Sequence, residues 1–170
     1  NALQEMLQQL QAAVVKHIQG QLVLDKSLWQ GVPTAEAFHD DSDAAFTVEP
    51  DTHMLDYHVV WLQFLNQESE RWKLFPPLAG INVDDSQLRW NTQISCGQLK
   101  NRVQSQWLGS TILLKGSINA ACTDQTMYSK GVVGDEFVYR AFTGLWQNMG
   151  GTGADGFRVS TTPIAAGRIL

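Results

Sequence analysis

The chain has 170 residues, of which 44% are hydrophobic and 17% charged, with six Trp, seven Phe and three Tyr. This composition excludes a disordered chain, and the length fits a single domain over residues 1–170. The formal net charge is −5, and we expect no nucleic-acid partner, because phosphate binding needs clustered Lys and Arg.

The first predicted element is a helix within residues 1–20. Its apolar residues recur at the i, i+3, i+4, i+7 spacing of a helix with one buried stripe. They are Leu3, Met6, Leu7, Leu10, Val14 and Ile18. Gly20 follows and suits a left-handed C-cap, so the helix is expected to end there. The stripe must be covered, most simply by a sheet.

An irregular, acidic segment follows over residues 21–54. From Ser27 to Glu70 the chain has nine Asp and Glu residues and no Lys or Arg. A solvated connecting loop is the simpler interpretation. The alternative is an acidic patch that packs on the more basic remainder of a like subunit.

Residues 55–170 are predicted to be rich in β-strands. Alternation of apolar and polar residues indicates strands near 55–61, 71–75 and 88–94, and further strands near 136–142 and 157–161. Leu99, Val103 and Trp107 recur at intervals of four and indicate a short helix. The predicted fold class is therefore α+β, with the N-terminal amphipathic helix packed on an antiparallel β-sheet with long irregular loops.

The two cysteines, Cys96 and Cys122, form no CxxC motif and have no neighbouring His. This spacing disfavours a zinc site and leaves either a disulfide or two buried thiols. A disulfide is favoured, and it would stabilise the fold by about 3–4 kcal/mol in the chain-entropy model. It would also indicate a periplasmic or extracellular protein.

Three histidines, His39, His53 and His58, lie among the acidic residues, and imidazoles with carboxylates are common metal ligands. Their spacing matches no metal motif, so a solvated acidic face is the simpler interpretation. A metal-binding protein or hydrolase that uses them stays an alternative. The chain has no G-x-S-x-G motif. We therefore predict no catalytic residue, no metal site and no cofactor, and expect that the chain is not an enzyme.

Five tryptophans could line a sugar-binding face, because flat aromatic rings stack on pyranose rings. Trp61, Trp72, Trp90 and Trp107 lie in apolar patterns typical of a core. Trp146 is the one expected to be exposed, and it is the candidate ligand contact.

An opening amphipathic helix over residues 3–20, a connecting loop, a sheet and the cysteine pair Cys96 and Cys122 occur in this order. The order resembles the soluble domain of a type IV pilin or pseudopilin. Since the chain begins with Asn1 rather than Met, we expect that an N-terminal piece has been removed.

The resemblance implies a structural subunit of a pilus (fimbrium) or secretion apparatus, extracellular or periplasmic at the cell surface. Such a subunit would act by packing with like or related subunits, and in some cases by cell adhesion. It would meet a membrane only through a segment that precedes Asn1. The alternatives are a structural protein of a phage or virus and the metal-dependent hydrolase.

Overall fold

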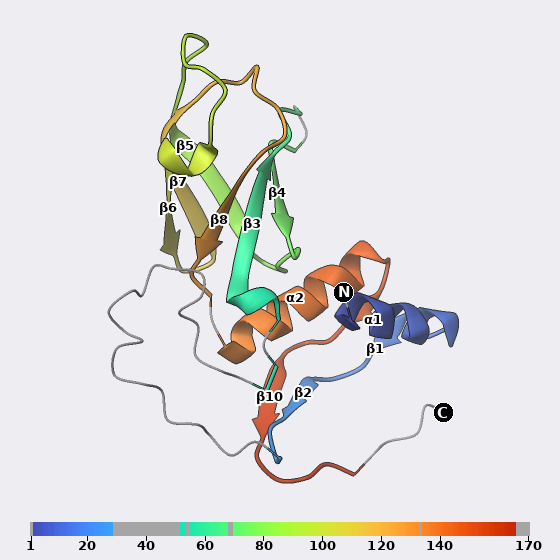
Figure 1. The fold of residues 1–170 in the computed structure, drawn as a ribbon. Coiled ribbons are helices and arrows are strands. Elements are labelled where there is room, and N and C mark those ends of the chain that lie inside the picture. The colour runs from blue at the N-terminus through green and yellow to red at the C-terminus, as the bar shows by residue number, and fades with distance from the viewer. Residues whose placement is uncertain (1, 29–51, 54, 68–69, 133, 166–170) are drawn as a thin grey trace, which may run out of the picture. The chain divides into compact units, whose positions relative to one another are not determined.

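The structure is a computed structural model that describes residues 2–28, 52–53, 55–67, 70–132 and 134–165 (Figure 1). The chain divides into two compact units. Asn1–His58 and Val132–Leu170 form the first, which we call the terminal unit, and Val59–Gly131 form the second, which we call the central unit. The single domain expected from chain length stays a prediction.

The central unit contains two three-stranded sheets among its described residues. In the first, β3 (Val59–Phe64) lies between β4 (Trp72–Phe75) and β8 (Gln125–Lys130) and is antiparallel to both. In the second, β7 (Thr111–Ile118) lies between β5 (Asn82–Trp90) and β6 (Val103–Leu108), parallel to β5 and antiparallel to β6. A short 3-10 helix, η3 (Leu99–Asn101), precedes β6.

Side-chain burial follows the strand patterns of the central unit. In β3, Leu62 and Phe64 are buried on one face, whereas Trp61, on the opposite face, is exposed, as expected for a sheet with one face on a core. In β7, three consecutive residues from Ile112 are buried, so both faces of that strand are covered. Gly116 in β7 has a φ of +131°, and a Cβ there would collide with the carbonyl oxygen of Arg102. Glycine at this position allows the chain before β6 to approach β7 closely.

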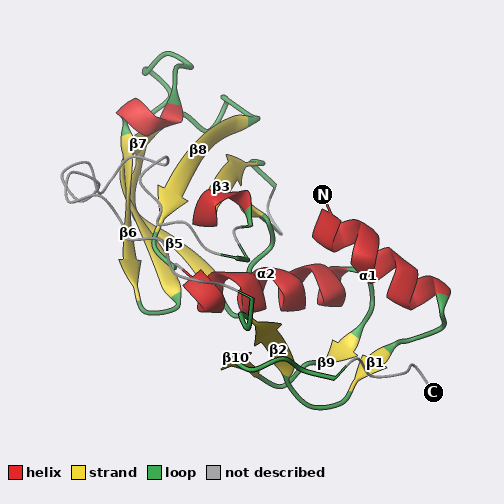
Figure 2. Ribbon diagram, turned by 60° about the horizontal axis from the view of Figure 1, so that its bottom comes forward, coloured by secondary structure: helices red, strands yellow, loops and turns green. Residues whose placement is uncertain are grey.

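The terminal unit joins segments from both ends of the chain. Helix α1 (Ala2–Ala12) packs on helix α2 (Gly134–Asn148), as Figure 2 shows. Strand β1 (His17–Ile18) pairs with β9 (Thr152–Gly153), and β2 (Leu22–Asp25) pairs with β10 (Phe157–Ser160), both in parallel. A 3-10 helix, η2 (Asp56–His58), also belongs to this unit. Neither described helix is long and apolar enough to cross a membrane.

The predicted fold class is wrong. Helix α1 packs on a second helix and not on an antiparallel sheet, and three of the strand pairs described, β1–β9, β2–β10 and β5–β7, are parallel. The described part of the chain is mostly β-structure with two α-helices. Periodicity requires only that the apolar stripe be covered, and it does not identify which element covers it.

The opening helix is also shorter than predicted, because it ends at Ala12. The chain then turns through Val14, whose φ is +65°, and Ile18 pairs with Gly153 in a strand. Val14, Val15 and Ile18 are β-branched, and such residues favour extended backbone over helix.

Two further elements differ from the prediction. The segment from Leu99 to Trp107 is η3 followed by strand β6, and the predicted strand near 136–142 lies inside helix α2. The buried residues of α2 include Phe137, Val138, Ala141 and Phe142, which is helical spacing. The helical signal was therefore present in the sequence.

Candidate functional site

The predicted assembly helix contributes to the core of its own unit. Leu7 is fully buried in a cluster with Phe142, Trp146 and Ala154, and three other stripe residues pack against that cluster. Those three are Leu3, Leu10 and Ile18. The remaining two, Met6 and Val14, are exposed. Most of the stripe is thus covered within the terminal unit and does not form an assembly surface.

Trp146, expected to be exposed as a ligand contact, is fully buried at 0% exposure, so that expectation is wrong. Its indole Nε1–H donates to the backbone carbonyl of Thr152 at 3.0 Å. Gly151 lies so close to the ring that a side chain there would collide with it. Trp146 therefore belongs to the buried core of the terminal unit, together with Leu7, Phe142 and Ala154.

The histidines that the structure describes form no metal site. His39 lies outside the described residues. His58 is buried, its Nδ1 accepts a hydrogen bond from the Gly134 backbone N–H at 3.2 Å, and its ring lies 5.3 Å from that of Phe137. His53 hydrogen-bonds with the Thr52 hydroxyl at 3.2 Å. Within the described ranges no group of three or more His, Cys, Asp or Glu side chains could hold a metal ion.

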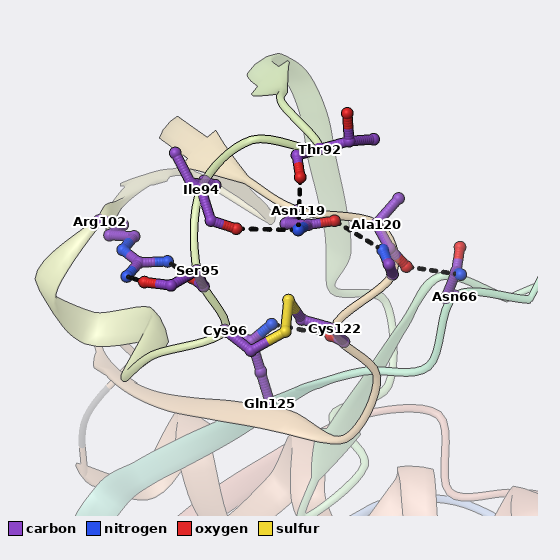
Figure 3. Close-up of a disulfide and its surroundings, with 11 residues drawn as sticks. Asn66, Thr92, Ile94, Ser95, Cys96, Arg102, Asn119, Ala120, Cys122 and Gln125 are labelled. Atoms are coloured by element: carbon purple, nitrogen blue, oxygen red, sulfur yellow. Dashed lines mark hydrogen bonds between the residues drawn. A yellow bond between two sulfur atoms is a disulfide. The ribbon is translucent and has the colours of Figure 1, made fainter.

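Cys96 and Cys122 form a disulfide in the central unit, with their Cα atoms 5.4 Å apart (Figure 3). Beside it, the Asn119 side chain donates to the carbonyl oxygens of Thr92 and Ile94 at 3.2 and 2.8 Å. Its own carbonyl oxygen accepts the Ala121 N–H at 2.9 Å. Asn119 is buried, so these bonds satisfy an amide that would be costly to leave unpaired.

Two further side chains form hydrogen bonds to the segments that flank the disulfide (Figure 3). The Arg102 guanidinium donates to the carbonyl and hydroxyl oxygens of Ser95, the residue before Cys96. The Asn66 amide donates to the carbonyl oxygen of Ala120 at 2.7 Å. The segments on both sides of the disulfide are therefore held by side-chain hydrogen bonds as well as by the covalent link.

A groove lies directly beside this disulfide, and the sequence interpretation missed it. Its volume is about 380 Å³. Trp61 and Tyr128 line it from the sheet, residues 97–100 line it from the segment after Cys96, and residues 125–127 from the start of β8. Every lining residue belongs to the central unit.

A row of three aromatic residues crosses the sheet, and two of them, Trp61 and Tyr128, line this groove. Trp61 of β3 is in register with Phe75 of β4 on one side and with Tyr128 of β8 on the other. The rings of Trp61 and Tyr128 meet edge to face, with centroids 5.9 Å apart. The exposed fractions are 48% for Trp61, 41% for Phe75 and 38% for Tyr128. The assignment of Trp61 to the core was wrong, because the buried face of β3 is the one that carries Leu62 and Phe64.

Two carboxyl groups have lowered pKa values, the exposed Asp25 and the half-buried Asp84. Backbone and side-chain hydrogen bonds from Ser27 lower the pKa of Asp25, and the hydroxyl and backbone N–H of Ser86 lower the pKa of Asp84. The backbone donors lie at 2.8 and 2.9 Å. These are local turn contacts, and neither carboxyl group lines the groove.

Comparison with known proteins gives a match over the whole chain. The model of the D-Ala-D-Ala carboxypeptidase 3 (S13) family matches residues 1–170. The structure is similar to penicillin binding protein 4 (dacB) from Haemophilus influenzae, with a TM-score of 0.55 and 15% identity over 95% of this chain and 36% of that one. A complex of that protein with a novel beta-lactam matches with a TM-score of 0.45 and 14% identity, over 98% and 35%. No curated protein matches.

The family match overturns the resemblance to type IV pilins and, with it, the interpretation as a structural subunit of a pilus or secretion apparatus. It also overturns the expectation that the chain is not an enzyme, because the matched family is one of carboxypeptidases. Of the predicted alternatives, the hydrolase agrees with the family match better than the pilus subunit does. The prediction that the protein lies outside the cytoplasm agrees with the family match. The prediction that it lies at the cell surface has no support from that match.

Proposed function

Because this chain belongs to the D-Ala-D-Ala carboxypeptidase 3 (S13) family, we propose that it is part of an enzyme that removes the last D-Ala from peptides ending in D-Ala-D-Ala. The observation that carries the proposal is the family match over residues 1–170. The chain spans 36% of the length of the similar solved structure, so the activity is proposed for the whole enzyme and not for this segment alone. Peptides of this kind occur in peptidoglycan, and the proposed location is the periplasm.

We further propose that the reacting groups lie outside these 170 residues. Penicillin-binding proteins carry their nucleophilic Ser in an S-x-x-K motif, accompanied by S-D-N and K-T-G. The sequence has no S-x-x-K and no K-T-G, and its nearest match to S-D-N is Ser117-Ile118-Asn119. The Asn119 amide of that match is occupied by the carbonyl oxygens of Thr92 and Ile94. This segment then has a supporting role, such as holding the substrate polymer.

The proposal is tested with the full-length protein and a soluble acyl-D-Ala-D-Ala peptide. Release of D-Ala is expected, and the same peptide ending in L-Ala-L-Ala should stay intact. A fluorescent penicillin should label one Ser covalently, and peptide mapping should place that Ser outside residues 1–170. The Ser117→Ala variant is the matched control and should keep both the labelling and the release of D-Ala.

Two results would contradict the proposal. If the full-length protein releases no D-Ala from the soluble peptide, the carboxypeptidase function is wrong. If the penicillin label maps to a residue within 1–170, the reacting groups are in this segment and the supporting role is wrong.

A further inference from the structure

The row of Phe75, Trp61 and Tyr128 on the β4–β3–β8 sheet takes no part in the proposed hydrolysis. Neighbouring strands lie about 4.8 Å apart, so the three in-register side chains span about 10 Å; Trp61 and Tyr128 line the groove, and Phe75 extends the aromatic surface beyond it. Aromatic rings on a sheet are rigid and bury a large area at a small cost in entropy. All three are more than one third exposed, although aromatic side chains of this size are usually well buried.

The polar residues of the groove complement a carbohydrate. Gln98, Gln125 and Thr126 line it beside the rings, and amide and hydroxyl groups both donate to and accept from sugar hydroxyl and acetamido groups. Lys100 adds a positive charge, and none of the described residues that line the groove carries a carboxylate. The groove therefore suits a ligand that is neutral or negatively charged.

The disulfide holds two walls of the groove in place. Residues 97–100 follow Cys96 directly, and the Gln125 amide donates to the carbonyl oxygen of Cys122 at 2.7 Å (Figure 3). The Cys96–Cys122 bond therefore joins the segment before one wall to the segment before the other. A surface that is ordered before binding loses less conformational entropy when the ligand arrives.

We propose that this aromatic groove binds the glycan strand of peptidoglycan and so holds the enzyme on the polymer whose peptides it trims. Sugar binding rests on the aromatic row and its polar neighbours, whereas the choice of this polymer rests on the proposed function. Aromatic rings with a lysine also suit single-stranded nucleic acid. The disulfide favours the glycan, because it indicates an oxidising location outside the cytoplasm.

The test measures binding of the full-length protein to a soluble hexamer of β-1,4-linked N-acetylglucosamine by calorimetry, and to purified peptidoglycan by co-sedimentation. Trp61→Ala should weaken hexamer binding about tenfold, which corresponds to about 1.4 kcal/mol, and Tyr128→Ala about threefold, or about 0.7 kcal/mol, because the indole ring has the larger stacking area. Both variants should also sediment less with peptidoglycan. Trp90→Ala is the matched control: Trp90 is 43% exposed and does not line the groove, so its removal should leave both readouts unchanged.

Three outcomes overturn the inference: the hexamer and peptidoglycan both fail to bind, Trp61→Ala binds them as wild type does, or a single-stranded oligonucleotide binds the groove more tightly than the hexamer. Release of D-Ala by the wild-type protein is measured in parallel. If release occurs without binding that depends on Trp61, only the groove proposal fails. If binding depends on Trp61 but no D-Ala is released, only the proposed carboxypeptidase function fails.

Discussion

The two units of the chain are stabilised in different ways. The central unit is one continuous stretch whose sheets pair strands such as β3 with β4 and β6 with β7, and a disulfide crosses it. The terminal unit pairs residues from opposite ends of the chain, for example Leu22 with Phe157, around the buried ring of Trp146. A disulfide thus stabilises the central unit. The terminal unit depends on a buried core around Trp146 and on contacts between residues far apart in the sequence.

Charge separates the two units as well. The terminal unit has twelve Asp and Glu residues against five Lys and Arg, whereas the central unit has five against seven. The aromatic groove therefore lies in the unit with the positive balance. A negatively charged polymer is attracted to that unit and repelled by the other.

Removal of the Trp146 ring should have the largest effect and should be confined to the terminal unit. Trp146→Ala is expected to cost about 3–5 kcal/mol, because it removes a fully buried side chain and the hydrogen bond to Thr152. Chemical denaturation with residue-level hydrogen exchange measures the loss. Trp61→Ala is the matched control and should cost about 1 kcal/mol or less, since that ring is exposed. Equal costs for both variants would contradict the assignment of Trp146 to the core.

Loss of the disulfide should weaken the central unit next. Replacement of both Cys96 and Cys122 by Ser is expected to lower the free energy of unfolding by about 3–4 kcal/mol, because the unfolded chain regains the freedom of an open loop. Hydrogen exchange should accelerate within residues 92–130 first. A reductant should destabilise the wild type and leave the double variant unchanged. A wild type that resists the reductant would show that the covalent link is not what stabilises this unit.

Substitution of Asn119 should have the smallest of the three effects. Asn119→Ala leaves the carbonyl oxygens of Thr92 and Ile94 without their donor and is expected to cost about 1–3 kcal/mol. Asn119→Asp keeps the acceptor for the Ala121 N–H but turns a carboxylate oxygen towards those two carbonyl oxygens. We therefore expect the Asn119→Asp protein to be no more stable than the Asn119→Ala protein. The melting temperature of each variant is the measurement. An Asn119→Asp protein as stable as wild type would show that the two donated bonds contribute little.

Some of these structural features could be predicted from the sequence. Periodicity predicted an amphipathic helix at the N-terminus and strands near 55–61, 71–75 and 157–161, which overlap β3, β4 and β10. The two cysteines were favoured as a pair. The helical spacing of Phe137, Val138, Ala141 and Phe142 was also readable, although it was interpreted as a strand. The family was not recognised, since these residues contain neither an S-x-x-K nor a K-T-G motif.

Local pattern by itself determined where apolar side chains recur, and so which segments need a covered face. Only the tertiary structure decided what covers each face: α2 covers the stripe of α1, and Trp146 is buried while Trp61 is exposed. The reason is that periodicity gives the direction of a side chain relative to its own strand or helix. Burial depends on elements from distant parts of the chain, and the groove beside the disulfide likewise forms only when β3, β8 and the segment after Cys96 come together.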